Sequence, residues 1–314
     1  MSTKYIVARE WGFGFWADVN HILGVCLLSE ITNRIPIAYW GPNSLFSCHK
    51  EEDAFSRFFK PLSPFPAHDL IGKGYDYFGD EWSDETLLAP FKRNVGTPSL
   101  RKNIVKGLLG RTERVVVSKT HFRAVDLLAE IPYSHSLYGL DPKSVYRWLC
   151  KKYLKPNPDI VLAADSFHQR HLEGKKFIAV HIRGSDKQFE VGELLQKVNR
   201  TYFDLLEPLK DRDDWNIFVL TESQPLLDEF IERFGEKVVF TDCHRTAGNE
   251  GIHYSAKKNG EALGREVLID SLIALKGDRF LGNGASSVSC AIEALKDWPE
   301  ETVAQVIPNC WTAD

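Results

Sequence analysis

The segment from Phe177 to Glu190 reads FIAVHIRGSDKQFE and indicates the fold of the chain. Its first four residues form an unbroken apolar run, which is typical of a strand buried on both faces of a parallel sheet. His181 and Arg183 then share one side of the extended chain, because side chains alternate along a strand. Gly184 and Ser185 end the strand. Ligands of open α/β sheets bind beyond the carboxyl ends of the strands, so these polar residues stand where a ligand would sit.

Ionisable side chains are concentrated at the end of this predicted strand. They are His181, Arg183, Asp186, Lys187 and Glu190. A planar guanidinium offers paired donors to a phosphate, so Arg183 suits an anionic ligand. A lone Arg after a strand would more often be an ordinary loop charge. Five ionisable groups within so short a segment favour a ligand site instead.

Composition and charge restrict the class of protein. The 314 residues suffice for one large or two medium domains, and the net charge of -4 argues against nucleic acid as the main partner. We see neither a secretory signal nor an apolar run of membrane-spanning length. The six cysteines form no Cys-x-x-Cys pair, so most are expected to be buried thiols of a reducing compartment. We expect a cytoplasmic protein that could contact the inner face of the membrane peripherally.

The amino-terminal segment has the order of a nucleotide-binding βαβ unit. A strand at 4–8 is followed by a Gly-rich loop, a helix over 17–33 and a strand at 35–40. Gly12 and Gly14 allow backbone N–H groups to approach a phosphate at a helix amino terminus, although a tight turn explains such a pair equally well. The dinucleotide fingerprint lacks its third glycine and no P-loop is present, so neither of those classes is predicted.

Repeated strand–helix units after the central strand predict a second parallel sheet. Strands are expected at 215–220, 238–240 and 279–282, and helices at 198–210, 225–234, 264–275 and 288–295. Thr221 ends one of these strands, so it is a further candidate for a ligand contact. Ser286 and Ser287 stand at the start of the last helix, where they form either an anion pocket or a simple N-cap. The Asp-x-Asp at 211–213 is interpreted as a solvated turn, and no metal site is predicted.

Three spaced segments resemble the fucosyltransferase superfamily, which includes the rhizobial nodulation-factor fucosyltransferase and the mammalian core α1,6-fucosyltransferase. The segment HIRGSDK at 181–187 is similar to its His-x-Arg-x-x-Asp-Lys signature. The Gly loop, followed by Asn20-His21 and the Thr-x-Arg of 32–34, is similar to the first family segment. Asp270 together with the serines at 286–287 is similar to the third. An ordinary polar helix face is the alternative interpretation of Asn20 and His21.

This resemblance implies an α/β glycosyltransferase of the GT-B type, with two Rossmann-like, doubly wound parallel-sheet domains facing across a cleft. Residues 1–165 would be the acceptor-side domain, and residues 166–314 would bind the nucleotide sugar, with a carboxyl-terminal tail that could pack back on the first domain. The reaction would be the inverting, metal-independent transfer of fucose from GDP-fucose to a hydroxyl of an oligosaccharide or lipid-linked glycan. The GDP-sugar is the donor substrate, and no cofactor is expected.

The resemblance also implies roles for the candidate residues. The diphosphate leaving group would be stabilised by the backbone of Gly12 and Gly14 and by Arg183, Lys187, Ser286 and Ser287. His181 and Asp270 would hold the guanine or the ribose. The additional candidates are Asn20, His21, Asp186, Thr221 and His253, of which Asp186 is expected to fix the loop or Arg183. Glu190 is the best-placed general base for the acceptor hydroxyl.

Two departures from the family pattern bear on these roles. Gly184 stands where the α1,6 enzymes have a second Arg, and Glu190 is offset by one residue from the base proposed in those enzymes. Two alternatives therefore stay open. One is a glycosyltransferase that uses another nucleotide sugar, and the other is a non-catalytic carbohydrate- or nucleotide-binding protein on the same scaffold.

Overall fold

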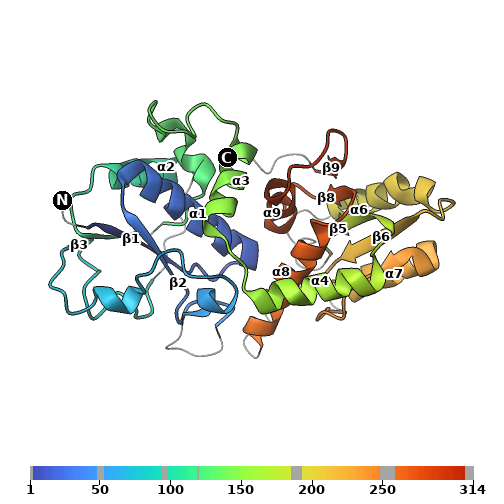
Figure 1. Ribbon diagram of the computed structural model, residues 1–314, viewed down its shortest axis with the longest axis horizontal. Coiled ribbons are helices and arrows are strands. Elements are labelled where there is room, and N and C mark those ends of the chain that lie inside the picture. Colours follow the sequence, from blue (N-terminus) through green and yellow to red (C-terminus); the bar gives the residue numbers. More distant parts are fainter. Residues whose placement is uncertain are drawn as a thin grey trace. The chain divides into compact units, whose positions relative to one another are not determined.

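The chain forms two compact units, which divide between Asn157 and Pro158. The computed structural model describes residues 3–47, 53–92, 98–118, 120–184, 193–247 and 259–307. Each unit is built on one parallel β-sheet (Figure 1). The domain boundary expected from the sequence, between residues 165 and 166, falls within helix α4 (Pro158–His171), which opens the second unit.

The first unit has a four-stranded parallel sheet in the order β2-β1-β4-β3. Its strands are β1 (Tyr5–Arg9), β2 (Ile35–Tyr39), β3 (Tyr77–Phe78) and β4 (Val115–Val117). Strand β1 lies between β2 and β4, and all five of its residues are buried. The amino-terminal strand–loop–helix–strand unit predicted from the sequence is therefore present, and its first strand, β1, lies in the interior of the sheet.

The two faces of the first sheet are covered differently. Helix α1 (Phe15–Thr32) packs against β1 and β2 and is surrounded by further helical segments. These are α2 (Pro98–Leu109), η3 (Ala124–Glu130) and α3 (Pro142–Tyr153). The other face buries side chains of a loop-rich segment that includes the 3-10 turn η2 (Ala67–Leu70), with Trp82 and Leu87. The turn η1 (Ala54–Arg57) lies beside β2. Irregular chain thus covers a face where a doubly wound sheet would carry long helices.

The second unit has a five-stranded parallel sheet in the order β7-β6-β5-β8-β9. Its strands are β5 (Lys176–His181), β6 (Trp215–Leu220), β7 (Val238–Val239), β8 (Arg279–Gly282) and β9 (Val303–Gln305). Counted along the chain within this unit, the order is 3-2-1-4-5, as in the first five strands of a nucleotide-binding doubly wound sheet. Strand β5, which carries the apolar run of the sequence, is central.

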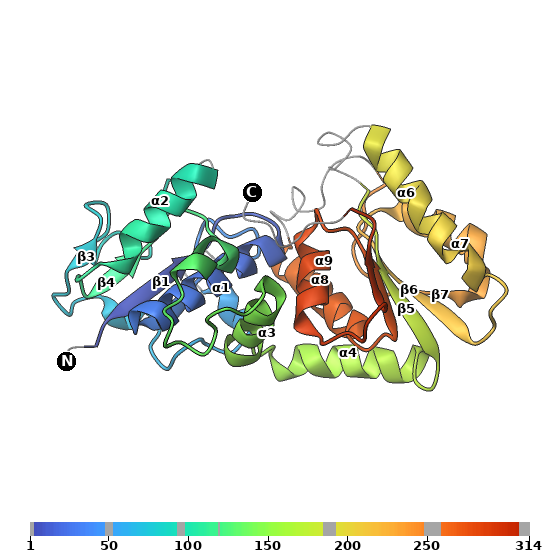
Figure 2. The same cartoon turned by 90° about the horizontal axis from the view of Figure 1, so that it is seen from above.

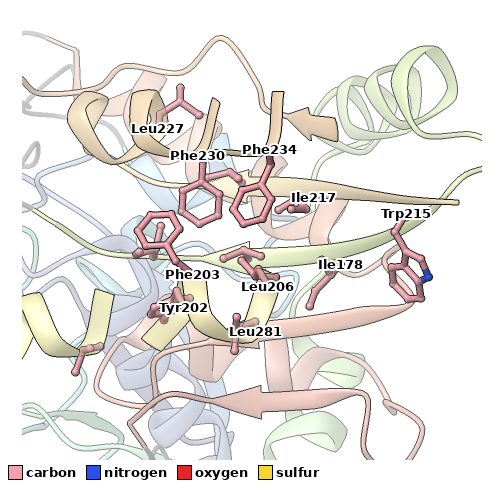
Figure 3. Packing of buried hydrophobic residues seen from close by; sticks show 14 residues of the cluster. Ile178, Tyr202, Phe203, Leu206, Trp215, Ile217, Leu227, Phe230, Phe234 and Leu281 are labelled. Atoms are coloured by element: carbon pink, nitrogen blue, oxygen red, sulfur yellow. The ribbon is translucent and has the colours of Figure 1, made fainter. Parts of the chain in front are cut away.

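Helices cover both faces of the second sheet. Figure 2 shows α6 (Glu193–Leu206) and α7 (Gln224–Phe234) on one side, and α4, α8 (Gly260–Ala274) and α9 (Ser287–Leu295) on the other. The turns η4 (Glu207–Leu209) and η5 (Gly235–Lys237) follow α6 and α7. Side chains of β5 alternate between the two cores, since Ile178 faces one cluster and Phe177 the other. In Figure 3, aromatic residues of α6 and α7 pack over Ile178 and Ile217.

These observations confirm the predicted α/β class with two parallel sheets. No helix in the described ranges is long and apolar enough to cross a membrane. At the carboxyl end, Ile307 packs against the core of the second unit, and residues 308–314 lie outside the described part of the chain. Cys26, Cys150 and Cys243 are free thiols, whereas Cys290 is disulfide-bonded and is an exception to the expectation that most cysteines are free.

Candidate functional site

Polar side chains are buried where strands β5, β6 and β8 end. Strand β5 pairs in parallel with both β6 and β8, so the three carboxyl ends lie at one edge of the sheet. The buried polar residues that end these strands, or lie in the following loops and the first turn of α9, are His181, Thr221, Ser223, Asn283, Ser286 and Ser289. Buried polar groups are costly unless they are paired, so this concentration is unlike an ordinary sheet edge. We take this edge as the candidate site.

His181 is the last residue of β5 and is held at two points. The hydroxyl of Tyr202 donates to its backbone oxygen at 2.9 Å, and its Nδ1 lies 2.6 Å from Ser289 Oγ. Burial, with a contribution from the positive charge of Arg183, lowers the pKa of the imidazole to about 3. His181 is therefore neutral at physiological pH. It can donate or accept a hydrogen bond, but it does not supply a positive charge.

Arg183 and Gly184 follow the end of β5. Arg183 is half-buried, and its charge acts on the neighbouring His181. The N–H of Gly184 donates to Glu222 Oε1 at 3.0 Å. A Cβ on Gly184 would lie 2.7 Å from Leu226 Cδ1 and 2.8 Å from Ser223 Cβ. This close packing leaves no room for the second Arg of the α1,6 enzymes unless its neighbours move, which gives the departure a physical reason.

Ser286 is the N-cap residue of α9, but its side chain does not cap the helix. Ser286 is only 2% exposed, and its Oγ has no hydrogen-bond partner among the described residues. The turn before it is fixed separately, because Asn283 Oδ1 accepts the N–H of Ala285 at 2.9 Å. Ser287 is the partly exposed first residue of the helix. An N-cap serine normally accepts an N–H from the first turn, so the simple N-cap interpretation of Ser286 is wrong.

Asp270 lies on α8 and is also buried. Thr241 Oγ1 donates to its Oδ1 at 2.7 Å. Burial raises the pKa of this carboxyl to about 7, although the Thr241 hydrogen bond and the charge of Arg245 act in the opposite direction. A carboxyl that titrates near neutral pH in a buried position is a frequent feature of ligand sites.

The loop after β7 contributes residues that the sequence did not single out. Arg245 donates to the backbone oxygens of Thr241 at 2.7 Å and Cys243 at 3.2 Å. Beside it, His244 Nδ1 lies 2.6 Å from Glu266 Oε1 on α8. The run of polar residues directly after strand β7 was the signal that could have identified this loop. It places a guanidinium beside the Asp270 carboxyl.

In the first unit, the Gly loop folds around a carboxylate. Gly12 has a φ of 65°, which favours glycine. The backbone N–H groups of Trp11, Gly12 and Phe13 donate to the Asp18 side chain at 3.2, 3.1 and 3.2 Å. These three amides are thus hydrogen-bonded to a side chain of the same protein. Gly14 is exposed, with nothing within 4 Å of an added Cβ.

The two candidates on α1 have different surroundings. Asn20 is half-buried, whereas His21 is fully buried in the first unit. The Nδ1 of His21 lies 3.2 Å from both the N and the O of Phe122, and its ring stacks on His121 at a centroid distance of 5.3 Å. Burial lowers the pKa of His21 well below its ordinary value. His21 is a core residue, so neither a polar helix face nor an exposed ligand contact describes it.

The remaining candidates are only partly covered by the structure. Thr221 is buried after β6, where its Oγ1 accepts the N–H of Ser223 at 3.2 Å. Four predicted residues lie outside the described residues: Asp186, Lys187, Glu190 and His253. Within the described ranges, no group of three or more side chains has the makeup of a metal site. His181, Thr221, Asp270 and Ser286 are the predicted ligand residues that the structure buries in the second unit.

Comparison with known proteins identifies the fold. No family model and no curated protein matches the sequence. Solved structures do match, among them the fucosyltransferase NodZ from Bradyrhizobium, with a TM-score of 0.63 and 15% identity over 92% of this chain and 91% of that one. NodZ α-1,6-fucosyltransferase soaked with GDP-fucose matches with a TM-score of 0.62 and 15% identity, over 94% of this chain and 93% of that one. A mutant of Arabidopsis thaliana FUT1 in complex with GDP matches with a TM-score of 0.56 and 11% identity, over 96% of this chain and 72% of that one. The chain therefore has the fold of these fucosyltransferases.

Proposed function

We propose that this protein is a glycosyltransferase that moves fucose from GDP-fucose to a hydroxyl of a glycan, with inversion and without a metal. Its fold is that of NodZ, which was solved soaked with GDP-fucose, and of a plant FUT1 solved in complex with GDP. A fold alone does not define an activity, so the proposal depends on the groups at the edge of the second sheet.

The observation that carries the proposal is the Ser286 hydroxyl. It is buried at the amino terminus of α9 and has no hydrogen-bond partner among the described residues. A helix amino terminus favours an anion, because its first N–H groups are unpaired and its dipole is positive there. A hydroxyl at the same place adds a donor. The ligand that suits this combination is a phosphate of the donor diphosphate.

The buried carboxyl of Asp270 supports a guanine nucleotide. A carboxylate has two acceptor oxygens, and guanine offers it two neighbouring donors, the N1–H and the 2-amino group. Adenine, cytosine and uracil offer no such pair to one carboxylate. A site built around hydrogen-bonding groups discriminates strongly against ligands that leave those groups unpaired. GDP is therefore preferred to ADP, CMP and UDP in this proposal.

Transfer requires a stabilised leaving group and a base. Negative charge grows on the diphosphate as the glycosidic bond breaks, and Arg183 and Lys187 are the cations assigned to it. Glu190 would accept the proton of the attacking hydroxyl, and Asp186 would orient the loop. The acceptor is an oligosaccharide or a lipid-linked glycan, which would bring the protein to a membrane surface only peripherally.

The test is the release of GDP from GDP-fucose, measured with a panel of free oligosaccharides and, without them, as hydrolysis by water. Glu190→Gln is expected to reduce release at least 100-fold while GDP affinity stays within about twofold of the parent, since general-base catalysis contributes about 10²–10⁴-fold. Glu207→Gln, at an exposed surface pair with Lys210, is the matched control and should keep full activity. Parental rates in Glu190→Gln would exclude Glu190 as the base. If the parent protein binds GDP but forms no GDP from GDP-fucose, the non-catalytic alternative is favoured.

A further inference from the structure

Ser289 connects three elements at the edge of the second sheet. It lies on α9, and its side chain is fully buried. Its Oγ accepts the backbone N–H of Asn283, which follows β8, at 2.9 Å. The same oxygen lies 2.6 Å from Nδ1 of His181, which ends β5. One hydroxyl thus joins a helix to the ends of two neighbouring strands.

The hydrogen bonds of this hydroxyl determine where its proton lies. A serine hydroxyl has one proton and two acceptor sites, and the N–H of Asn283 uses one acceptor. If the Ser289 hydroxyl donates to His181 Nδ1, every polar atom in the contact is paired. If Nδ1–H donated instead, the hydroxyl proton would need another acceptor, and the described residues provide no third hydrogen bond to Ser289 Oγ. A buried donor without an acceptor is costly, so the first arrangement is favoured.

A neutral imidazole carries one N–H, and the tautomer is set by the hydrogen bond of the other nitrogen. Burial keeps His181 neutral, as shown by the low pKa of this residue. If Nδ1 accepts from Ser289, the single N–H must be at Nε2. His181 then approaches a ligand as a hydrogen-bond donor and not as a base.

We propose that Ser289 is a positioning residue that holds His181 in the Nε2–H tautomer, so that Nε2 donates to an acceptor atom of the bound nucleotide. The tautomer follows from the contacts of Ser289 and the burial of His181. The identity of the ligand rests on the proposed function. Phosphate oxygens and the guanine carbonyl are acceptors, so either group of GDP can receive this hydrogen bond.

The tautomer can be measured directly in the ligand-free protein. The protein is labelled with ¹⁵N-histidine, and two-bond ¹H–¹⁵N spectra show which imidazole nitrogen carries the proton. The signals of His181 are identified as those that disappear in His181→Asn. We expect a protonated Nε2 and a bare Nδ1 in the parent. A protonated Nδ1 in the parent would overturn the inference, whether or not the protein binds GDP.

Variants test the role of the hydroxyl. In Ser289→Ala we expect the His181 signals to shift toward a mixture of tautomers, whereas Ser289→Thr, which keeps a hydroxyl, should retain the parental pattern. Ser271→Ala is the matched control, because Ser271 is an equally buried serine on α8 whose Oγ donates to Val267 O at 2.7 Å. It should leave the His181 signals unchanged. An unchanged tautomer in folded Ser289→Ala would show that Ser289 does not set it.

Calorimetry with GDP then tests the link to the ligand. Ser289→Ala is expected to weaken GDP binding about fivefold, the loss of a typical hydrogen bond, and Ser271→Ala less than twofold. A changed tautomer with unchanged GDP affinity would refute donation to the nucleotide. If the parent binds no GDP, the proposed function fails while the spectra still decide the tautomer. If Ser289→Ala does not fold, the parental spectrum and Ser289→Thr decide it.

Discussion

Replacing Gly184 by alanine tests whether close packing determines the residue after Arg183. An ideal Cβ at this position would lie 2.7 Å from Leu226 Cδ1, 2.8 Å from Ser223 Cβ and 3.0 Å from Ser223 Oγ. Real Cβ contacts are longer than these, so at least two neighbours must move. The end of the Leu226 side chain can rotate away. The Cβ of Ser223 is fixed to the backbone at the N-cap of α7, so its movement also shifts the start of that helix.

The expected cost follows from this geometry. Overpacking by one methyl group in a tightly packed region costs about 1–3 kcal/mol, and a contact with a backbone-fixed atom belongs in the upper half of that range. We therefore expect Gly184→Ala to lower the free energy of unfolding by about 2 kcal/mol. For a unit of this size, the melting temperature should fall by about 4–8 °C.

Urea unfolding of the parent and four variants measures the effect. Gly110→Ala is the matched control, because nothing lies within 4 Å of a Cβ there, and it should change stability by less than about 0.5 kcal/mol. Ser223→Gly removes the Ser223 Cβ that an alanine at 184 would contact. The loss of unfolding free energy in the double variant Gly184→Ala, Ser223→Gly should therefore be at least about 0.5 kcal/mol smaller than the sum of the losses in the two single variants. If Gly184→Ala is as stable as the parent, close packing does not explain this glycine.

Three further predictions concern ionisation and the phosphate contact. The pKa of Asp270 is about 7, and GDP would bind its ionised form. GDP affinity should therefore rise about tenfold per pH unit from pH 5 to 7 and level off above pH 7. A calorimetric affinity that does not change with pH would contradict this. Burial raises the pKa of Asp18 from 3.8 to about 7, so the folded state binds this proton more tightly than the unfolded state does. This stabilises the folded state fully below pH 4, and the free energy of unfolding then falls by on the order of 1 kcal/mol per pH unit up to pH 7. Asp18→Asn should reduce that slope in urea unfolding, and an unchanged slope would refute the assignment. Ser286→Ala should weaken GDP binding about tenfold, with Ser56→Ala, at an exposed position, as the control; equal affinities would exclude Ser286 as a phosphate contact.

The second unit could be predicted from its sequence because its strands carry strong local signals. The run from Phe177 to Val180 is apolar throughout, and the structure buries its alternate residues in the two cores on opposite faces of the sheet. Gly and Ser after β8 marked the start of α9. The rule that ligand groups follow strand ends predicted His181 and Ser286 as ligand contacts. The structure buries both side chains, and their contact with a ligand stays a prediction.

The first unit was harder to predict, for physical reasons. One face of its sheet is covered by 3-10 turns and loops, which have no hydrophobic period that a sequence can display. The Gly loop has the pattern of a phosphate loop, yet three of its amides bind Asp18. That carboxylate stands in the first turn of α1, where an acidic residue is usually interpreted as a helix-dipole contact. Only the folded loop distinguishes the two roles.

Long-range pairing explains the other residues that the sequence missed. Ser289 and His181 are 108 positions apart, and Ser289 looks like any small residue within a buried helix. Arg245 meets Asp270 only because the loop after β7 folds onto α8. Neither pair follows a local pattern, so no spacing within one segment could have predicted it.

The direct test of GDP-fucose as the donor is calorimetric titration with GDP, in the presence and absence of EDTA. UDP, CMP and ADP are the controls. We expect GDP to bind at least tenfold more tightly than the other nucleotides, and EDTA to leave its affinity unchanged. Equal or tighter binding of UDP, CMP or ADP would contradict the assignment of GDP-fucose as donor, and loss of GDP binding in EDTA would contradict metal independence.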